Sequence, residues 1–153
     1  MSKNEELLLS CVILTRNNSE TIREVIQSVH RIADEIVIVD DHSTDGTRQT
    51  AKSFERVTIV TNKMKSFCEQ RNFGAKQCRG TWILMLDSDE ILSARLARSI
   101  RKAVESPCYE AYDFLRKSIF MQKTINYCDY TSFTNMPRLY KKGLAPFVGD
   151  VHE

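Results

Sequence analysis

Residues 7–40 read LLLSCVILTRNNSETIREVIQSVHRIADEIVIVD, with two apolar runs on either side of an amphipathic segment. The runs at 7–14 and 36–39 are apolar on both faces, as is typical of strands in a parallel sheet with both sides covered. The segment between them begins behind a cap candidate at Asn18 or Ser19. Four of its apolar residues recur at the spacing of one helix face: Ile22, Val25, Ile26 and Val29. The stretch therefore predicts a strand, a helix and a second strand.

The same alternation continues beyond residue 40. Runs at 57–61 and 82–86 predict two more strands, and helices are expected at 44–54, at 67–78 and after Ser93. The order βαβαβαβα calls for an α/β fold with a doubly wound, mainly parallel sheet and right-handed crossovers. Ligands of such sheets bind beyond the carboxyl ends of the strands. Candidate site residues are therefore sought where the strands end.

The pattern changes after Pro107. Residues 111–121 and 138–141 resemble strands, whereas residues 124–136 are polar and aromatic without a clear period. No closing helix follows before Glu153. We therefore expect one domain that is incomplete at its C-terminus.

The composition permits one compact domain, because 42% of the 153 residues are hydrophobic and 27% are charged. The 22 lysines and arginines exceed the 20 aspartates and glutamates only slightly and are scattered, which gives no support for nucleic acid as a partner. No apolar stretch approaches the roughly 20 residues of a membrane span, and residues 1–6 are too polar for a signal peptide. Five cysteines without a C-x-x-C pair predict reduced thiols. We expect a cytoplasmic protein.

Carboxylates follow two of the predicted strands. Asp40 and Asp41 follow the strand at 36–39, and Asp87 and Asp89 follow the strand at 82–86. Residues two apart in an extended segment project to the same side, so Asp87 and Asp89 can face one site. Their hard oxygen ligands suit Mg²⁺ or Mn²⁺, completed by water and phosphate oxygens. Helix capping by Asp89 is the structural alternative.

The turn at 40–47 reads DDHSTDGT and contains more acidic residues than a helix start requires. Ser43 or Thr44 can cap the following helix, and one such residue is sufficient for capping. The acidic pair Asp40 and Asp41 therefore indicates contact with a ligand.

Three motifs together resemble family 2 glycosyltransferases of the GT-A fold. They are LSCVILTRNNSETIREVIQSV at 9–29, EIVIVDDHSTDGT at 35–47 and QRNFGAKQCRGTWILMLDSDE at 70–90. The resemblance covers about residues 7–105, which it identifies as a nucleotide-binding half, with 106–153 as the start of an acceptor-side half. It implies an inverting enzyme that moves a sugar from a nucleotide-diphosphate donor, expected to be a UDP-sugar, to an acceptor hydroxyl.

The resemblance also assigns roles to single residues at the donor side. Thr15 and Arg16 match the position that packs against the nucleotide, and Asp41 matches the carboxylate that accepts a hydrogen bond from uracil. Arg71 matches a basic residue near the phosphates. Asp87 and Asp89 form the DxD motif, with Asp87 on the ribose side and Asp89 as a direct ligand of Mg²⁺ or Mn²⁺.

The terminal segment FVGDVHE at 147–153 resembles bacterial enzymes related to lipopolysaccharide-core glucosyltransferases. An inverting transfer needs a base for the acceptor hydroxyl, and Glu153 and Asp150 are the candidates. His152 is the candidate for a further metal ligand. A glycan or lipid-linked acceptor is expected, and the latter implies peripheral association with the inner face of the cell membrane.

Two other functions remain open at the level of sequence. LMLDSDE at 84–90 also fits the nucleophile motif of haloacid-dehalogenase-like phosphohydrolases, but it follows the fourth predicted strand, and Glu90 stands where that family has Thr or Val. A truncated module that binds a nucleotide sugar without turning it over is the second alternative.

Overall fold

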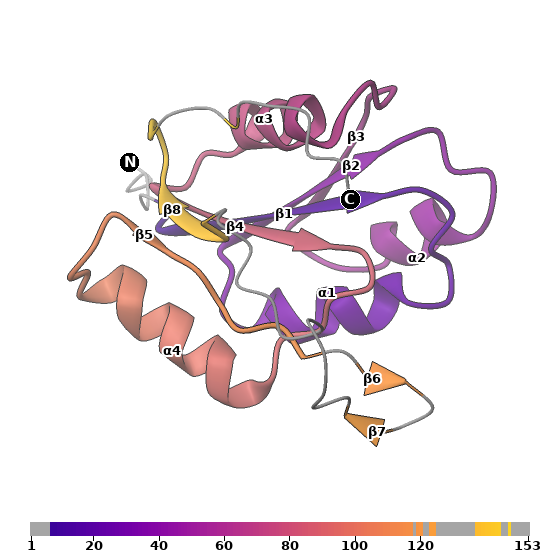
Figure 1. Ribbon diagram of the computed structural model, residues 1–153. Coiled ribbons are helices and arrows are strands. Elements are labelled where there is room, and N and C mark those ends of the chain that lie inside the picture. Colours follow the sequence, from indigo (N-terminus) through magenta and orange to yellow (C-terminus); the bar gives the residue numbers. More distant parts are fainter. Residues whose placement is uncertain (1–6, 118, 121–122, 125–136, 145–146, 148–153) are drawn as a thin grey trace, which may run out of the picture.

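The computed structural model describes residues 7–117, 119–120, 123–124, 137–144 and 147, and Figure 1 shows their arrangement. Helices and strands alternate in the order that the apolar runs predict. The elements are β1 Leu9–Thr15, α1 Ile22–His30, β2 Glu35–Asp40, α2 Thr47–Lys52, β3 Val57–Thr61, α3 Phe67–Gln77, β4 Trp82–Asp87, α4 Ala94–Glu105, β5 Ala111–Tyr112, β6 Ile119–Phe120, β7 Lys123–Thr124 and β8 Leu139–Lys141.

Six strands form the main sheet in the order β3-β2-β1-β4-β8-β5. The four strands β1 to β4 are mutually parallel, and β8 lies antiparallel to both β4 and β5. The sheet is therefore mainly parallel, as the sequence predicts. The long strand expected at 111–121 is wrong: among the described residues of this region only β5 joins the sheet, while β6 pairs with β7 in a separate two-stranded ribbon.

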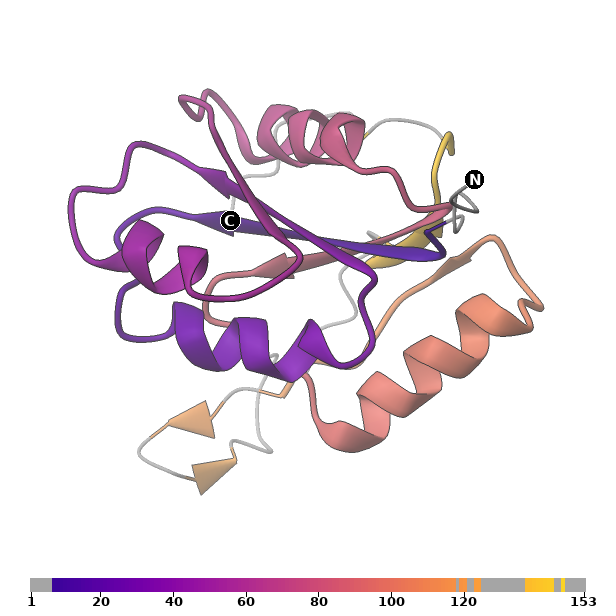
Figure 2. The same ribbon diagram turned by 180° about the vertical axis from the view of Figure 1, so that it is seen from behind.

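Helices cover both faces of the main sheet, so the fold is doubly wound. Figures 1 and 2 show α1, α2 and α4 on one face and α3 on the other. The first face is sealed by a core that includes Ile26 from α1, Ile100 from α4 and Ile38 from β2. The face under α3 is sealed by a smaller core that includes Val39 and Met85. The full burial of β1 and β2 explains why their sequences are continuous apolar runs.

Two helices begin later than their capping residues suggest. The N-cap of α1 is Thr21 and not Asn18 or Ser19, although the carbonyl oxygen of Asn18 accepts the N–H of Ile22 at 3.0 Å. The N-cap of α2 is Gly46 and not Ser43 or Thr44. The expected capping side chains have other partners, because the side-chain oxygen of Asn18 accepts from Ser88 and the hydroxyl oxygen of Ser43 accepts from the N–H of Asn17. Asp45 serves α2 instead, since its carboxylate accepts the N–H of Thr47 at 2.9 Å.

Within the described ranges, no helix is long and apolar enough to cross a membrane. Four of the five cysteines are free thiols in the described residues, namely Cys11, Cys68, Cys78 and Cys108, and Cys128 lies outside them. Burial raises the pKa of the Cys78 thiol to about 12, so this side chain behaves as an apolar core residue.

Candidate functional site

The candidate site lies at the carboxyl edge of β1, β2 and β4, on the face covered by α3. Side chains alternate between the two faces of a strand, and Val39 and Met85 belong to the core under α3. Asp41 and Asp87, two residues further on, extend the same rows. The fold thus places both acidic clusters at one edge, as the sequence predicts.

Asp41 is a nearly buried carboxylate with several donors around it. Its oxygens accept hydrogen bonds from the guanidinium of Arg16 and from the backbone N–H of Met64, both at 3.2 Å, and the His42 ring lies 3.5 Å away. Desolvation acts to raise the pKa of Asp41, but the Met64 N–H, His42 and Arg16 together hold it below its usual value. Asp41 is therefore an ionised acceptor.

Asp40 serves a different purpose from its neighbour. It is fully buried on the opposite face, where its Oδ2 accepts the backbone N–H of Ser43 at 3.1 Å. Its Oδ1 has no hydrogen-bond partner in the part of the chain that the structure describes. The acidic pair is thus split, with Asp40 shaping the loop between β2 and α2 and Asp41 available to the site.

The loops after β1 and β4 are tied together through Asn18. Its side-chain oxygen accepts hydrogen bonds from the hydroxyl of Thr15 at 2.9 Å and from the hydroxyl of Ser88 at 2.8 Å. Thr21 adds a hydrogen bond to the carbonyl oxygen of Ser88 at 2.7 Å. Thr15 therefore has a structural role beside the nucleotide contact that the resemblance implies for it. The extended segment expected at 87–89 is wrong, because β4 ends at Asp87 and the N–H of Glu90 donates to the carbonyl oxygen of Asp87 at 3.0 Å, which closes a turn.

The first aspartate of the DxD motif is held between two buried arginines. One oxygen of Asp87 lies 3.4 Å from Nη2 of Arg71, which comes from α3, and the other lies 3.3 Å from Arg138, which precedes β8. Both arginine side chains are almost fully buried. The guanidinium of Arg71 also lies over the ring of Phe67, 5.5 Å from its centroid.

Glu90 completes this ion-pair network. It lies 3.2 Å from Arg138 and 3.3 Å from Arg116, and its Oε2 accepts the backbone N–H of Asp87 at 2.9 Å. Sequence reasoning missed Glu90, Arg116 and Arg138 as site residues. Their partners are up to 51 residues away along the chain, so no local pattern reveals the contacts.

Asp89, by contrast, is exposed, and no partner contacts its carboxylate within the described residues. The capping alternative for Asp89 is wrong, because Ser93 is the N-cap of α4 and accepts the N–H of Leu96 at 3.2 Å. The described ranges contain no group of three side chains that holds a metal by itself. A free hard carboxylate fits Mg²⁺ or Mn²⁺ when water and phosphate oxygens supply the other ligands.

Asp150, His152 and Glu153 lie outside the described residues. The start of their segment is described, however. Phe147 exchanges two backbone hydrogen bonds with the side chain of Asn72, at 2.8 and 2.9 Å, and its ring packs against Tyr140. Asn72 follows Arg71 on α3, so residue 147 is docked on the helix that covers the site.

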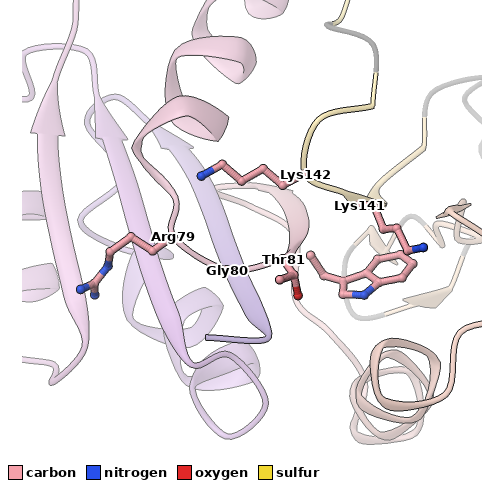
Figure 3. A pocket seen from close by; sticks show the side chains of 6 residues that line it. Arg79, Gly80, Thr81, Lys141 and Lys142 are labelled. Carbon is pink, nitrogen blue, oxygen red and sulfur yellow. The ribbon is translucent and has the colours of Figure 1, made fainter. Parts of the chain in front are cut away.

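A separate hollow of about 430 Å³ opens near the amino end of β4, away from the carboxylates (Figure 3). Its lining residues are Arg79, Gly80, Thr81, Trp82, Lys141 and Lys142. All three of its cations have partners: Arg79 binds Glu35 at 2.7 Å, Lys141 lies 3.6 Å from Glu110, and Lys142 binds the carbonyl oxygen of Cys78. The hollow does not include any residue of the predicted site.

A mainly parallel sheet with antiparallel β8, and with aspartates at its carboxyl edge, agrees with the GT-A fold that the sequence resemblance implies. Its solved neighbours have this fold. The chain is similar to S. aureus TarS 1–349, with a TM-score of 0.66 and 20% identity, covering 89% of this chain and 47% of that one. It is also similar to mannosyl-3-phosphoglycerate synthase from Rubrobacter xylanophilus, with a TM-score of 0.56 and 23% identity, covering 66% and 38% of the two chains.

Residues 10–148 match the model of Glycosyl transferase family 2, and the chain belongs to this family. An uncharacterised glycosyltransferase of Rickettsia prowazekii (strain Madrid E) is 32% identical over 149 residues, which cover 94% of this chain and 50% of the relative. The lipopolysaccharide core biosynthesis glycosyltransferase LpsC of Rhizobium meliloti (strain 1021) is 33% identical over 95 residues, covering 60% of this chain and 35% of that protein. The chain spans about half the length of the first Rickettsia relatives that it matches.

Proposed function

We propose that this chain binds the donor of an inverting glycosyltransferase, which moves a sugar from a UDP-sugar to an acceptor hydroxyl. The observation that supports this most directly is the placement of Asp41 and Asp87 in parallel rows at one edge of the sheet, in a chain of family 2. TarS, which shares the fold at a TM-score of 0.54 and 24% identity in this comparison, is solved in complex with UDP-GlcNAc.

Asp41 is suited to recognising the nucleotide base of the donor through a hydrogen bond. Its carboxylate is kept ionised and is fixed by Arg16 and the Met64 N–H, and an ionised carboxylate still has lone pairs for another donor. The N–H of a uracil ring is such a donor. Cytosine lacks this N–H, so the contact favours uridine nucleotides.

Arg71 and Asp89 act on the diphosphate side of the donor. Arg71 is held in one orientation by Asp87 and Phe67, so its positive charge needs no reorganisation when a diphosphate arrives. Asp89 is an exposed carboxylate, without an ion pair among the described residues, that would hold Mg²⁺ or Mn²⁺. The bound cation would neutralise charge that grows on the departing nucleoside diphosphate.

The acceptor side of the proposal rests on the segment that follows Phe147. We retain Glu153 and Asp150 as candidate bases and His152 as a candidate ligand, and the contact between Phe147 and Asn72 supports their approach to the site. The match to LpsC supports a role of the whole protein in cell-surface glycan or lipopolysaccharide synthesis, with a glycan or lipid-linked acceptor at the inner face of the membrane.

A thermal-shift panel of UDP, CDP, GDP, ADP and UDP-sugars, each with and without Mn²⁺, tests the donor assignment. UDP at 100 times its dissociation constant should stabilise the protein by about 2.7 kcal/mol when Mn²⁺ is present. A larger shift with any other nucleotide contradicts the uridine assignment. Donor binding without transfer to any acceptor favours the non-catalytic module, and phosphate release from simple phosphomonoesters favours the phosphohydrolase alternative.

A further inference from the structure

Three buried or half-buried arginines surround two of the three acidic residues of the DSDE segment at 87–90. Arg71 and Arg138 hold Asp87, while Arg138 and Arg116 hold Glu90. Asp89 alone is exposed, and no arginine contacts it within the described residues. Among the described residues, the segment therefore contains two carboxylates whose charge is compensated and one whose charge is not.

Arg138 is the member that joins the two compensated carboxylates. Its Nη1 and Nη2 each lie 3.3 Å from Oδ2 of Asp87, and they lie 3.3 and 3.2 Å from the two oxygens of Glu90. One planar guanidinium thus contacts two carboxylates at once, which the single ammonium of a lysine does less well. Without a cation between them, Asp87 and Glu90 would repel each other.

The backbone of Arg138 gives the side chain a fixed origin. Its carbonyl oxygen accepts the N–H of Met85 at 2.7 Å, and its N–H donates to the carbonyl oxygen of Tyr112 at 3.0 Å. These hydrogen bonds extend the β8 pairing on both sides. Arg138 therefore enters the site from a strand that lies beside the strand carrying the DxD motif.

We propose that Arg138 is a positioning residue that keeps Asp87 paired with arginine, so that Asp89 is the carboxylate left to bind a divalent cation. This inference rests on the proposed function, because it concerns the same donor site. One free carboxylate binds Mg²⁺ or Mn²⁺ weakly, since affinity for these ions rises with the number of charged ligands. Firm binding of the cation then depends on the phosphate oxygens of the donor.

The test measures Mn²⁺ binding by electron paramagnetic resonance of the free ion, with the whole chain and without nucleotide. Arg138→Met removes the cation and keeps an apolar side chain of similar length. It releases one Asp87 oxygen, while Arg71 stays with the other oxygen and Arg116 stays with Glu90, so Mn²⁺ alone should bind roughly tenfold more tightly than to the unaltered protein. Glu90→Gln is the matched control, because it removes a carboxylate but retains the ion pair between Arg138 and Asp87. It should not tighten Mn²⁺ binding.

A folded Arg138→Met protein with unchanged or weaker Mn²⁺ affinity overturns the proposal, because a merely structural arginine would give this result. If Arg138→Met does not fold by circular dichroism, Arg138→Gln takes its place. It also removes the cation, so it should bind Mn²⁺ more tightly than the unaltered protein does, and an affinity equal to that of the unaltered protein counts against the proposal. Failure of the unaltered protein to bind UDP with Mn²⁺ would instead contradict the proposed function, and the measurement with Mn²⁺ alone still decides the role of Arg138.

Discussion

At the scale of single residues, Asp41, Asp87 and Asp89 are chemically identical side chains with different surroundings. Asp41 accepts hydrogen bonds from Arg16 and the Met64 N–H, Asp87 is held by two buried arginines, and Asp89 is exposed. These surroundings predict different consequences when each is altered.

Asp41→Asn keeps the shape of the side chain but removes its charge, and it presents one oxygen and one amide group in place of two acceptors. We expect UDP to bind roughly tenfold more weakly, because a hydrogen bond to a charged group is stronger than one between neutral groups. Calorimetric titration with UDP measures this change. Titration with pyrophosphate and Mn²⁺ is the control and should be unaffected, and equal loss for both ligands would show that Asp41 does not contact the base.

Asp89→Asn should abolish the dependence of UDP binding on Mn²⁺ and change the free energy of unfolding by less than about 0.5 kcal/mol, because the side chain is exposed and has no ion pair in the part of the chain that the structure describes. Asp87→Asn should destabilise the fold by about 3 kcal/mol, because it removes the counter-charge of buried Arg71 among the described residues and leaves buried Arg138 with Glu90 alone. Urea unfolding of both variants measures the contrast. Similar stability of the two would show that the Asp87 network is not structural.

Part of the loss of stability at acidic pH is expected to come from Asp45. Hydrogen bonds from the Thr47 hydroxyl and N–H, with a further one from the Ser19 N–H, lower the pKa of Asp45 from 3.8 to about 2. A lowered folded-state pKa stabilises the protein above the unfolded value, and this contribution is lost as the pH falls from 3.8 toward 2.

Asp45→Asn should therefore be less stable than the unaltered protein at neutral pH and should lose less stability over that acidic interval. Urea unfolding at a series of pH values across the interval measures the slope. Parallel pH profiles for the two proteins would contradict the assignment to Asp45.

At the scale of elements, α3 determines how closely the site is covered, and Gly74 is the residue that permits this. A Cβ atom at Gly74 would lie 2.5 Å from a methyl carbon of Val12 and 2.9 Å from one of Val39. The helix therefore packs directly on β1 and β2, and this contact sets the height of Arg71 above the sheet.

Gly74→Ala should destabilise the protein by about 1–3 kcal/mol through overpacking, even though alanine favours a helix more than glycine does. Lys76→Ala, at an exposed position of the same helix, is the matched control and should be nearly neutral. Urea unfolding compares the two. A stabilised Gly74→Ala protein would mean that α3 can move away from the sheet without a loss of stability. In that case the contact between Arg71 and Asp87 should also change.

At the scale of the whole molecule, one sheet runs across both predicted halves of the chain. β8 and β5 come from the region after residue 105, yet β8 pairs with β4, and Leu139 is fully buried in the larger core. Arg138 from the same region reaches the DxD motif. The expected boundary between the two halves, at residue 105, therefore does not separate two sheets, because strands from both sides of it pair in one sheet.

A protein ending at residue 105 should associate or fail to fold cooperatively, because it exposes the β4 edge and the apolar surface that Leu139 and Tyr140 cover. Size-exclusion chromatography and thermal unfolding by circular dichroism measure this. The full 153-residue chain is the control. A monomeric, cooperatively unfolding 1–105 protein would show that the first half is an independent folding unit.

The sequence by itself determined the elements up to residue 105 and the edge at which the acidic residues lie, whereas the single strand expected at 111–121 was wrong. Doubly buried strands require continuous apolar runs, and the helix between β1 and β2 requires a periodic face, so both are visible locally. Because all parallel strands end at the same edge, Asp41 and Asp87 could be placed together before their contacts were known. The polar loops before α1 and α2 were harder to predict, since the side chain of Asn18 binds Ser88, 70 residues away along the chain, and that of Ser43 binds the N–H of Asn17 in the loop after β1.

Only the tertiary structure decided which carboxylates are compensated. The sequence around Asp87, Asp89 and Glu90 does not indicate which of them is paired with an arginine. Arg71 comes from α3, and Arg138 directly precedes β8, the strand beside β4. Ion pairs depend on distance in space, and distance between residues far apart in the chain is set by how the sheet and helices pack. For this reason the motif could be found from the sequence, whereas the difference between Asp87 and Asp89 required the fold.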